Sequence, residues 1–465
     1  MVVSVRTKML TDTDIKAYKV LAACCLGNLA SGFPVNSFGT VLLYVVSYLR
    51  EDGSDVRSSG VSFVPIMCTI ILSVTMFTGS LLEYLLGYTW SLIGVSAVFI
   101  ASLMLNFVAL KSFGAIVVIY CILGYCEGVL LVTFLSTAME WFPKKRGLAA
   151  GVSALGSGFS GFVFAAIQSA FINPWNYVPD HAPYVGYPDE KYFTQHDLLK
   201  RVPQSFLIVS AVSCVLLSIA VTLVSRPTEE EKTQLSGIKL KLIDSDPLLL
   251  EPDVQPFKMV KSPHFWVFFI IFGLGRCDFI FMNSLSKVFG ESFINNDHFL
   301  ATTGAIAGLM NGGGRLAWGT LSDVIGIQKT LMVQTGVLTL LMFTFYATKL
   351  GGEPMYFVWV SAIIFTSAGG FSLLPAAAMT FFGCKNTKLK IGFLYISQGV
   401  GALLQGFLML GWHIVLQWKG IMNIFGFCSL LAFLFSCLLH FVLKAVREER
   451  MSVLSRFTRI QPFSE

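Results

Sequence analysis

The segment Trp141-Phe-Pro-Lys-Lys-Arg-Gly147 is a short basic loop between two apolar runs, at residues 114–139 and 147–172. Each run is long enough to cross a bilayer as an α-helix, which takes about 20 apolar residues at 1.5 Å each. A similar segment, Phe381-Phe-Gly-Cys-Lys385, follows the apolar run at 355–381 and is itself followed by two further lysines. The repeated basic loop indicates two related sets of membrane helices within one chain.

The composition identifies lipid as the main solvent. Apolar residues make up 55% of the 465 residues and charged residues only 13%, with a mean hydropathy of +0.71. A soluble protein of this size needs far more charge to cover its surface. The net charge of +6 fits loops that face an anionic leaflet, so nucleic acid is not an expected partner.

The sequence carries no signature of catalysis or metal binding. The ten cysteines include no CxxC pair and no Cys/His cluster, so neither a metal site nor a disulfide framework is predicted. No P-loop and no Ser/His/Asp set is recognisable. We therefore expect no cofactor and no enzyme activity.

The apolar runs, and the Pro, Gly and charged residues that separate them, predict an all-α membrane protein. It has twelve transmembrane helices in two pseudo-symmetric six-helix bundles. Lys and Arg concentrate at the termini, in the central linker and in the even-numbered loops, which hold 22 of the 33. This bias predicts that both termini are cytoplasmic. The predicted spans are 20–48, 60–84, 88–110, 114–139, 147–172, 203–225, 263–289, 299–320, 329–348, 355–381, 391–414 and 420–443. The predicted units are an N-terminal bundle (1–225), a cytoplasmic linker (226–262), a C-terminal bundle (263–444) and a cytoplasmic tail (445–465).

A second pair of loops supports the internal repeat. Gly79-Ser-Leu-Leu-Glu83 follows the second span and leads to Gly87, whereas Gly319-Thr-Leu-Ser-Asp323-Val-Ile-Gly326 follows the eighth. Parallel repeats of this kind are typical of carriers whose binding site lies between the halves. We therefore predict gating roles for the loop residues Gly319, Asp323, Gly326, Lys144, Lys145 and Arg146.

These motifs resemble those of the major facilitator superfamily. More narrowly, the segment 141–151, the segment Asn311-Gly-Gly-Gly-Arg315 and the segment Tyr395-Ile-Ser-Gln398-Gly399 resemble the oxalate/formate antiporter family and its monocarboxylate-transporter relatives. The first span, in contrast, lacks the signature of animal monocarboxylate transporters. The resemblance implies a twelve-helix transporter that works by alternating access.

Arg315 is the first candidate for substrate binding. It lies eight residues before Asp323, about 12 Å inside the cytoplasmic end of its helix. A charge at mid-bilayer costs roughly 2.5–3.5 kcal/mol on insertion scales, and such charges usually mark function. A guanidinium matches a carboxylate with two parallel hydrogen bonds. The alternative is a structural ion pair, but the resemblance favours binding because the family's substrate arginine falls here.

Gln398 lies eight residues after Lys390 and therefore at a similar depth, about 12 Å from the cytoplasmic side. The resemblance implies a lysine at this position in dicarboxylate-handling members. A neutral amide cannot balance a second negative charge, so a monocarboxylate is implied. The alternative is that Gln398 only ties helices together. Tyr395 is expected to belong to the apolar wall around the carbon skeleton of the substrate.

Three further charges lie within the predicted spans. Arg276 and Glu127 share a depth of about 20 Å, so Arg276 either pairs with Glu127 or serves as a second anion site. Asp278 faces another side of the helix that carries Arg276. Glu127 and Asp278 are the candidates for proton coupling, with fixed structural pairs as the alternative for each.

The predicted function is secondary active transport of a small monocarboxylate, such as pyruvate, lactate or formate, by proton coupling or exchange. The alternatives are a carrier of another organic anion or amino acid and a membrane sensor that binds without transporting. The expected partners are a small carboxylate, a proton and the lipid bilayer. A monomer in the plasma membrane is expected, with an organelle membrane as the alternative location.

Overall fold

The computed structural model describes residues 11–51, 53–61, 63–181, 191–236, 253–411 and 418–460. Within these ranges the chain is almost entirely helical and contains no β-strand. The helices of the first half are α1 (Asp12–Ser31), α2 (Phe33–Asn36), α3 (Phe38–Glu51), α4 (Ser58–Val61), α5 (Phe63–Thr75), α6 (Thr78–Leu86), α7 (Tyr88–Ala109), α8 (Phe113–Trp141), α9 (Arg146–Ile172), α10 (His196–Leu199) and α11 (Arg201–Leu223). The remaining helices are α12 (Glu229–Ser236), α14 (Pro256–Val260), α15 (Pro263–Glu291), α16 (Asp297–Ile325), α17 (Ile327–Phe345), α18 (Thr348–Ala368), α19 (Gly370–Phe382), α20 (Thr387–Gly411) and α21 (Trp418–Ile460).

The predicted spans correspond to these helices, but several spans are broken. The first consists of α1, α2 and α3, and the second consists of α5 and α6, which are bent by 58° at their junction. Seven spans, or eight with this bent pair, are long and apolar enough to cross a membrane on composition alone. The others, α1–α3, α16, α17 and α20, are broken or more polar, and several of their polar side chains are buried against other helices.

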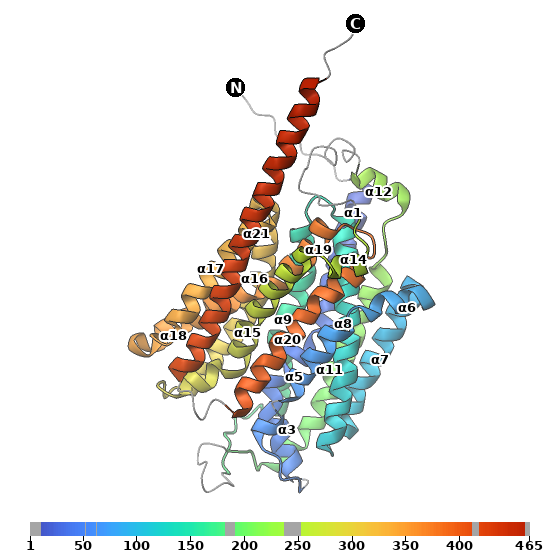
Figure 1. Cartoon of the computed structure of the whole chain (residues 1–465). Helices are drawn as coiled ribbons and strands as arrows, with labels where there is room; N and C mark the ends of the chain where they lie inside the picture. Colours follow the sequence, from blue (N-terminus) through green and yellow to red (C-terminus); the bar gives the residue numbers. More distant parts are fainter. Residues whose placement is uncertain are drawn as a thin grey trace, which may run out of the picture.

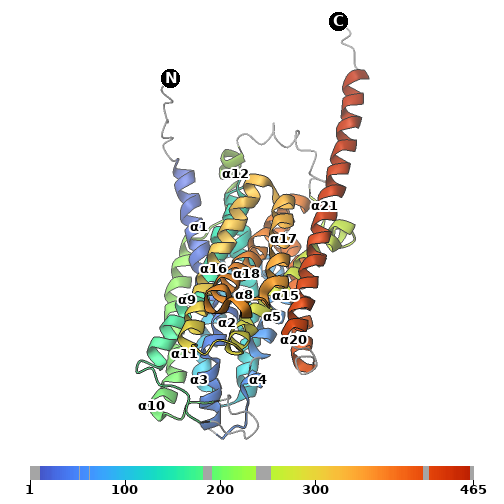
Figure 2. The same cartoon turned by 90° about the vertical axis from the view of Figure 1, so that its left-hand side faces the viewer.

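The two sets of helices lie side by side, with α7, α8 and α11 on one flank and α17, α18 and α21 on the other (Figure 1). Helix α1 begins and α21 ends at the same end of the bundle, as both views show (Figures 1 and 2). We call this the terminal end and the other the opposite end. Helix α21 continues to Ile460, so the predicted tail is helical up to that residue.

The outer faces of the bundle are strongly apolar. Val215 and Phe441 are each at least 60% exposed although they lie near the middle of the long helices α11 and α21. Such surface is unfavourable in water but suits the hydrocarbon region of a bilayer. The exposed side chains therefore agree with a multi-pass membrane protein.

Two helix pairs form most of the interface between the halves: α9 with α16, and α5 with α20. Glycines allow α9 and α16 to approach closely. A Cβ atom on Gly158 would lie 2.6 Å from the Cα of Gly312, and one on Gly319 would lie 2.3 Å from the carbonyl oxygen of Gly147. In a membrane, where lipid competes for apolar surface, such close backbone packing is a main source of helix association.

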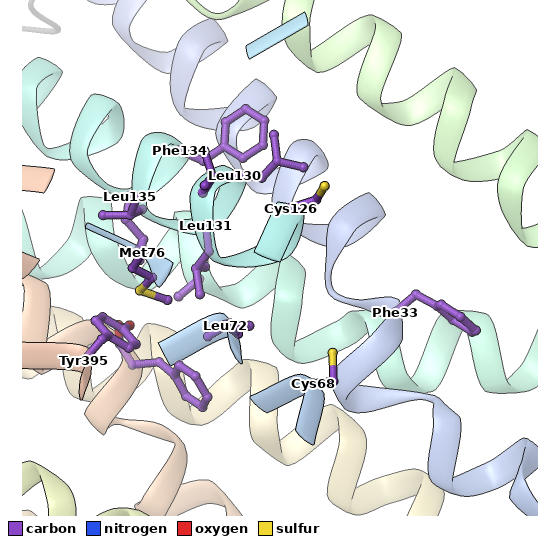
Figure 3. Packing of buried hydrophobic residues seen from close by; sticks show 14 of the residues in the cluster. Phe33, Cys68, Leu72, Met76, Cys126, Leu130, Leu131, Phe134, Leu135 and Tyr395 are labelled. Atoms are coloured by element: carbon purple, nitrogen blue, oxygen red, sulfur yellow. The ribbon is translucent and has the colours of Figure 1, made fainter. Parts of the chain in front are cut away.

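Helix α8 is the central helix of the first half. Its Phe134 ring occupies the space over Gly27 of α1, where a Cβ atom would lie 2.3 Å from the ring. Leu131 and Leu135 of the same helix pack with Met76 in the bend between α5 and α6, and Tyr395 of α20 lies at the edge of this cluster (Figure 3). The apolar core thus continues from the first half to the helix that carries the predicted Tyr395 and Gln398.

The start of the linker is attached to the first half. Lys16 of α1 forms an ion pair with Glu231 of α12 at 2.7 Å, and the Thr13 hydroxyl donates to the Gln234 side chain. Linker residues 237–252 lie outside the described residues. The linker helix α12 therefore lies at the terminal end, next to the beginning of α1.

Candidate substrate site between the two halves

A narrow cavity lies between the two halves of the protein. The first half contributes residues from α2, α5, α8 and α9, and the second half contributes residues from α15, α19 and α20. We call it the central cavity. Its lining residues are Val35, Asn36, Thr69, Leu72, Glu127, Leu131, Ser157, Arg276, Phe371 and Gln398.

The break between α1 and α3 brings Asn36 to this cavity. Gly32 permits close contact with α9, because a Cβ atom there would lie 2.6 Å from the Ser160 hydroxyl oxygen. The Asn36 amide then donates to the carbonyl oxygens of Gly32 and Ser157, at 3.0 and 3.1 Å. These bonds attach the helix break to α9 and hold Asn36 at the cavity.

Arg276 is a buried cation without an acidic partner among the described residues. Its side chain is 5% exposed, its Nε atom has no hydrogen-bond partner, and it forms no ion pair. Its guanidinium carbon lies 3.8 Å from the ring centre of Phe371 and 4.0 Å from that of Phe279. A buried charge that lacks a partner is costly, so this guanidinium is available for an anion in the central cavity.

Arg315 is fully buried and connects the two halves. Its Nε donates to the Asn311 side chain at 3.1 Å, and its Nη1 donates to the Ala154 carbonyl oxygen of α9 at 3.1 Å. Its Nη2 has no partner, and its guanidinium carbon lies 3.7 Å from the ring centre of Phe371. Arg315 therefore retains one donor group for a ligand, whereas its other groups fix it against α9.

Phe371 contacts both guanidiniums, and the sequence alone did not identify it. An aromatic ring attracts cations to its face, so one ring holds two like charges near each other. The Tyr395 hydroxyl donates to the Phe371 carbonyl oxygen at 3.2 Å and so helps to position the ring. Tyr395 does not line the central cavity, whereas Gln398 does, and Gln398 makes no hydrogen bond with the described residues.

Glu127 is the carboxyl group of the central cavity. It is 2% exposed, hydrogen-bonds the backbone of Val35, and leaves its Oε2 atom without a partner. It interacts electrostatically with Arg315 but forms no ion pair with Arg276 in the described structure. Of the two alternatives for Arg276, the structure therefore disfavours pairing with Glu127. Arg276 and Glu127 line the cavity, whereas Arg315 contacts the lining residue Phe371 and is not itself a lining residue. Together these two arginines and one carboxylate have a formal charge of +1.

Asp278 lies elsewhere, inside the second half. It is fully buried and accepts a hydrogen bond from the Ser429 hydroxyl of α21, while its Oδ1 atom has no partner. It does not line the central cavity. The two candidates for proton coupling thus occupy different environments.

Asp323 connects the halves at the terminal end. Its carboxylate accepts hydrogen bonds from the backbone N–H groups of Gly147 and Leu148, at 2.9 and 2.7 Å. These N–H groups belong to the first turn of α9, which has no intrahelical acceptors for them. Burial raises the pKa of Asp323, while the two N–H donors, Lys145 and Arg146 oppose that rise. We call this contact the terminal latch.

The glycines of the paired loops play matching conformational roles. Gly87 and Gly326 end α6 and α16 with positive φ angles of 80° and 86°, which glycine adopts without strain. Each donates its N–H to a carbonyl oxygen one helical turn earlier, on Glu83 and Ser322. The sequence repeat therefore corresponds to a structural repeat.

The three basic residues of the loop before α9 differ in position. Arg146 crosses to the second half, where it donates to the Met379 carbonyl oxygen at 3.2 Å and to the Cys384 sulfur at 3.1 Å. Lys145 occupies the N-cap position of α9 and interacts electrostatically with Asp323. Lys144 is exposed.

A second contact between the halves was not predicted as a pair. Lys388 at the start of α20 forms an ion pair with Glu83 of α6 and donates to the Thr133 hydroxyl at 3.1 Å. Arg226 also pairs with Glu83. Burial lowers the pKa of Lys388, and the nearby Glu83 carboxylate opposes that change. The equivalence of Glu83 and Asp323 in the two loops was the available sequence signal.

These contacts close the terminal end of the interface. Two six-helix halves around a buried polar cavity, held together at one end, form the architecture of a secondary transporter.

The chain belongs to the major facilitator superfamily, whose family model matches residues 24–388. It is therefore a multi-pass membrane transporter of a small molecule and not an enzyme. It is 25% identical to apicoplast pyruvate carrier 1 of Toxoplasma gondii, with 89% of this chain and 85% of that protein covered. It is 23% identical to the oxalate:formate antiporter of Oxalobacter formigenes, with 63% and 62% covered.

Solved structures agree with the fold. The proton:xylose symporter XylE matches with a TM-score of 0.67 at 12% identity, covering 91% of this chain and 95% of that one. The fucose:proton symporter FucP of E. coli matches with a TM-score of 0.62 at 12% identity, covering 92% and 99%. At these identities the likeness concerns the fold alone.

Proposed function

We propose that this transporter carries a small monocarboxylate across the bilayer, with the substrate carboxylate bound by Arg276 and Arg315. The observation that supports this proposal best is the buried guanidinium of Arg276 in the central cavity, which has no acidic partner among the residues that the structure describes. The guanidinium of Arg315, whose Nη2 has no hydrogen-bond partner in that part of the chain, contacts the same phenylalanine ring. A pair of guanidiniums suits a carboxylate better than a neutral solute.

The charge of the cavity favours a monocarboxylate. Arg276 and Arg315 against Glu127 leave one positive charge, which one carboxylate neutralises. Gln398 faces the cavity as a neutral amide and adds no charge for a second carboxylate. The two curated relatives are named for pyruvate, oxalate and formate, which are all small carboxylates.

Alternating access follows from the interface. The terminal latch and the ion pair of Lys388 with Glu83 hold the halves together at the terminal end. Release of these contacts, with closure at the opposite end, would expose the same central cavity to the other side of the membrane. The glycine-lined contact of α9 with α16 allows the two halves to rock against each other without moving bulky side chains.

Glu127 is our first candidate for the proton site. A carboxylate substrate on the guanidiniums would cancel the positive charge near Glu127 and so make protonation of Glu127 more favourable. Binding of substrate and proton would then support each other. Asp278, which lies outside the cavity, is the second candidate.

The test uses the purified full-length protein in liposomes and labelled pyruvate, lactate, formate and oxalate. We expect saturable uptake of monocarboxylates and about 10- to 100-fold lower uptake efficiency in Arg276→Gln, the loss of one charge-assisted contact. Arg315→Gln should show a similar loss, and Arg50→Gln in the last turn of α3, outside the central cavity, is the matched control. Uptake by Arg276→Gln equal to that of the wild type would contradict the proposed site.

Proton coupling is tested in the same liposomes with an inward proton gradient. We expect the gradient to stimulate wild-type uptake, and Glu127→Gln to abolish that stimulation while exchange continues. Loss of stimulation in Asp278→Asn instead would assign coupling to the interior of the second half. No effect of the gradient on the wild type would indicate exchange.

A further inference from the structure

A second cavity lies inside the second half of the protein, between α15, α17, the α18–α19 junction and α20. Arg276 and Gln398 line both this cavity and the central cavity. We call it the side cavity. The two spaces therefore share a wall formed by residues that we assign to the substrate.

The walls of the side cavity are mainly apolar. Ile271, Leu331 and Leu338 line it and are all at most 2% exposed. Three of its polar lining residues, Gln334, Thr335 and Ser367, use their donor groups on nearby backbone. Gln334 donates to the Thr366 carbonyl oxygen at 2.8 Å, and Thr335 donates to that of Leu331 at 2.6 Å. The space thus has a largely apolar surface and the cationic group of Arg276 in its wall.

Two glycines leave this space open. A Cβ atom on Gly275 or on Gly370 would meet no other atom within 4 Å. Each glycine directly precedes a residue of the substrate site, Arg276 on α15 and Phe371 on α19. In a well-packed helical core, side chains usually fill such positions, so the open space beside the guanidinium is a specific feature of this protein.

We propose that the side cavity receives the hydrocarbon chain of a substrate whose carboxylate is bound at Arg276. The protein would then take aliphatic 2-oxo monocarboxylates that are longer than pyruvate, and bind them more tightly. This inference rests on the proposed function. Burial of each added methylene group should increase the apparent affinity by up to about fourfold until the cavity is filled.

The test measures competition against labelled pyruvate uptake by the full-length protein in liposomes. The competitors are unlabelled pyruvate, 2-oxobutyrate, 2-oxovalerate and 2-oxohexanoate. We expect the concentration for half-inhibition to fall along this series in the wild type. Gly370→Val places two methyl groups in the side cavity and should remove most of this dependence on chain length. Leu338→Trp fills the cavity from α17 and should act in the same direction.

Gly94→Val is the matched control, because Gly94 lies on the exposed face of α7 and a Cβ atom there also meets no neighbour. It should keep the wild-type dependence on chain length. If the concentration for half-inhibition does not fall with chain length in the wild type, the side-cavity proposal is overturned. The proposed function still stands in that case if pyruvate is taken up. A wild-type dependence on chain length in both Gly370→Val and Leu338→Trp would also overturn the side-cavity proposal. Absence of saturable uptake or competition by any carboxylate would overturn both proposals.

Discussion

Removal of the Asp323 carboxylate should open the terminal end of the interface. In Asp323→Ala, the N–H groups of Gly147 and Leu148 lose their acceptor, and α9 loses a negative charge at its N-terminus. Loss of a comparable N-terminal cap costs about 1–2 kcal/mol. The Asp323 carboxylate is only partly desolvated and the residue remains accessible to solvent, which limits the purely electrostatic part of this value. One to two kcal/mol corresponds to about a 5- to 30-fold shift in the equilibrium between the closed and open states.

Amide hydrogen exchange measures this latch directly. Gly147 and Leu148 lie in the first turn of α9, where no intrahelical acceptor exists, so Asp323 provides their protection. Ala149, the next residue, donates to the Lys145 carbonyl oxygen and serves as an internal reference. We expect exchange at Gly147 and Leu148 to be about 5- to 30-fold faster in Asp323→Ala than in the wild type.

Two variants serve as controls for this measurement. Asp323→Asn keeps one oxygen acceptor and should give an intermediate rate. Glu353→Ala removes a carboxylate near the opposite end, where Glu353 accepts a hydrogen bond from Asn296, and should leave α9 unchanged. Wild-type exchange at both amides in folded Asp323→Ala would refute the latch.

Two further predictions concern the interface. Gly319→Ala should slow transport at least 10-fold, because its Cβ atom would lie 2.3 Å from the Gly147 carbonyl oxygen and overpacking costs about 1–3 kcal/mol. Gly313→Ala on the same helix, where a Cβ atom has open space, should transport normally, and equal rates would contradict the close-packing argument. In a double-mutant cycle of Glu83→Gln and Lys388→Gln, thermal unfolding of the purified protein should reveal a coupling of about 1 kcal/mol. Additive effects would show that this ion pair does not stabilise the closed interface.

The sequence predicted the architecture because that information is local. The length and hydropathy of each apolar run reflect the thickness of a bilayer, and basic loops and glycines recur at equivalent places in both halves. The glycines were especially informative. Gly87 and Gly326 adopt the same left-handed conformation at the ends of α6 and α16, as expected for a structural repeat.

The sequence also identified most of the charged residues of the site. A charge within an apolar run is expensive and is therefore conspicuous, which explains why Arg276, Arg315 and Glu127 were candidates from the start. Their depth was predictable from the rise of a helix. The residues that these charges contact were not predictable, because side chains from several helices lie at each depth of the bundle.

Only the tertiary structure decided which of these groups meet. It places Arg315 against the Ala154 carbonyl oxygen of the other half, leaves Arg276 without an acidic partner among the described residues, and turns Asp278 toward Ser429. Phe371 carries no charge and is one of 41 phenylalanines, so no local pattern distinguishes the ring between the guanidiniums. The sequence by itself determined the helices, their pairing into halves and the candidate charges. Contacts between residues far apart in the chain depend on helix rotation and packing, which hydropathy and spacing do not encode.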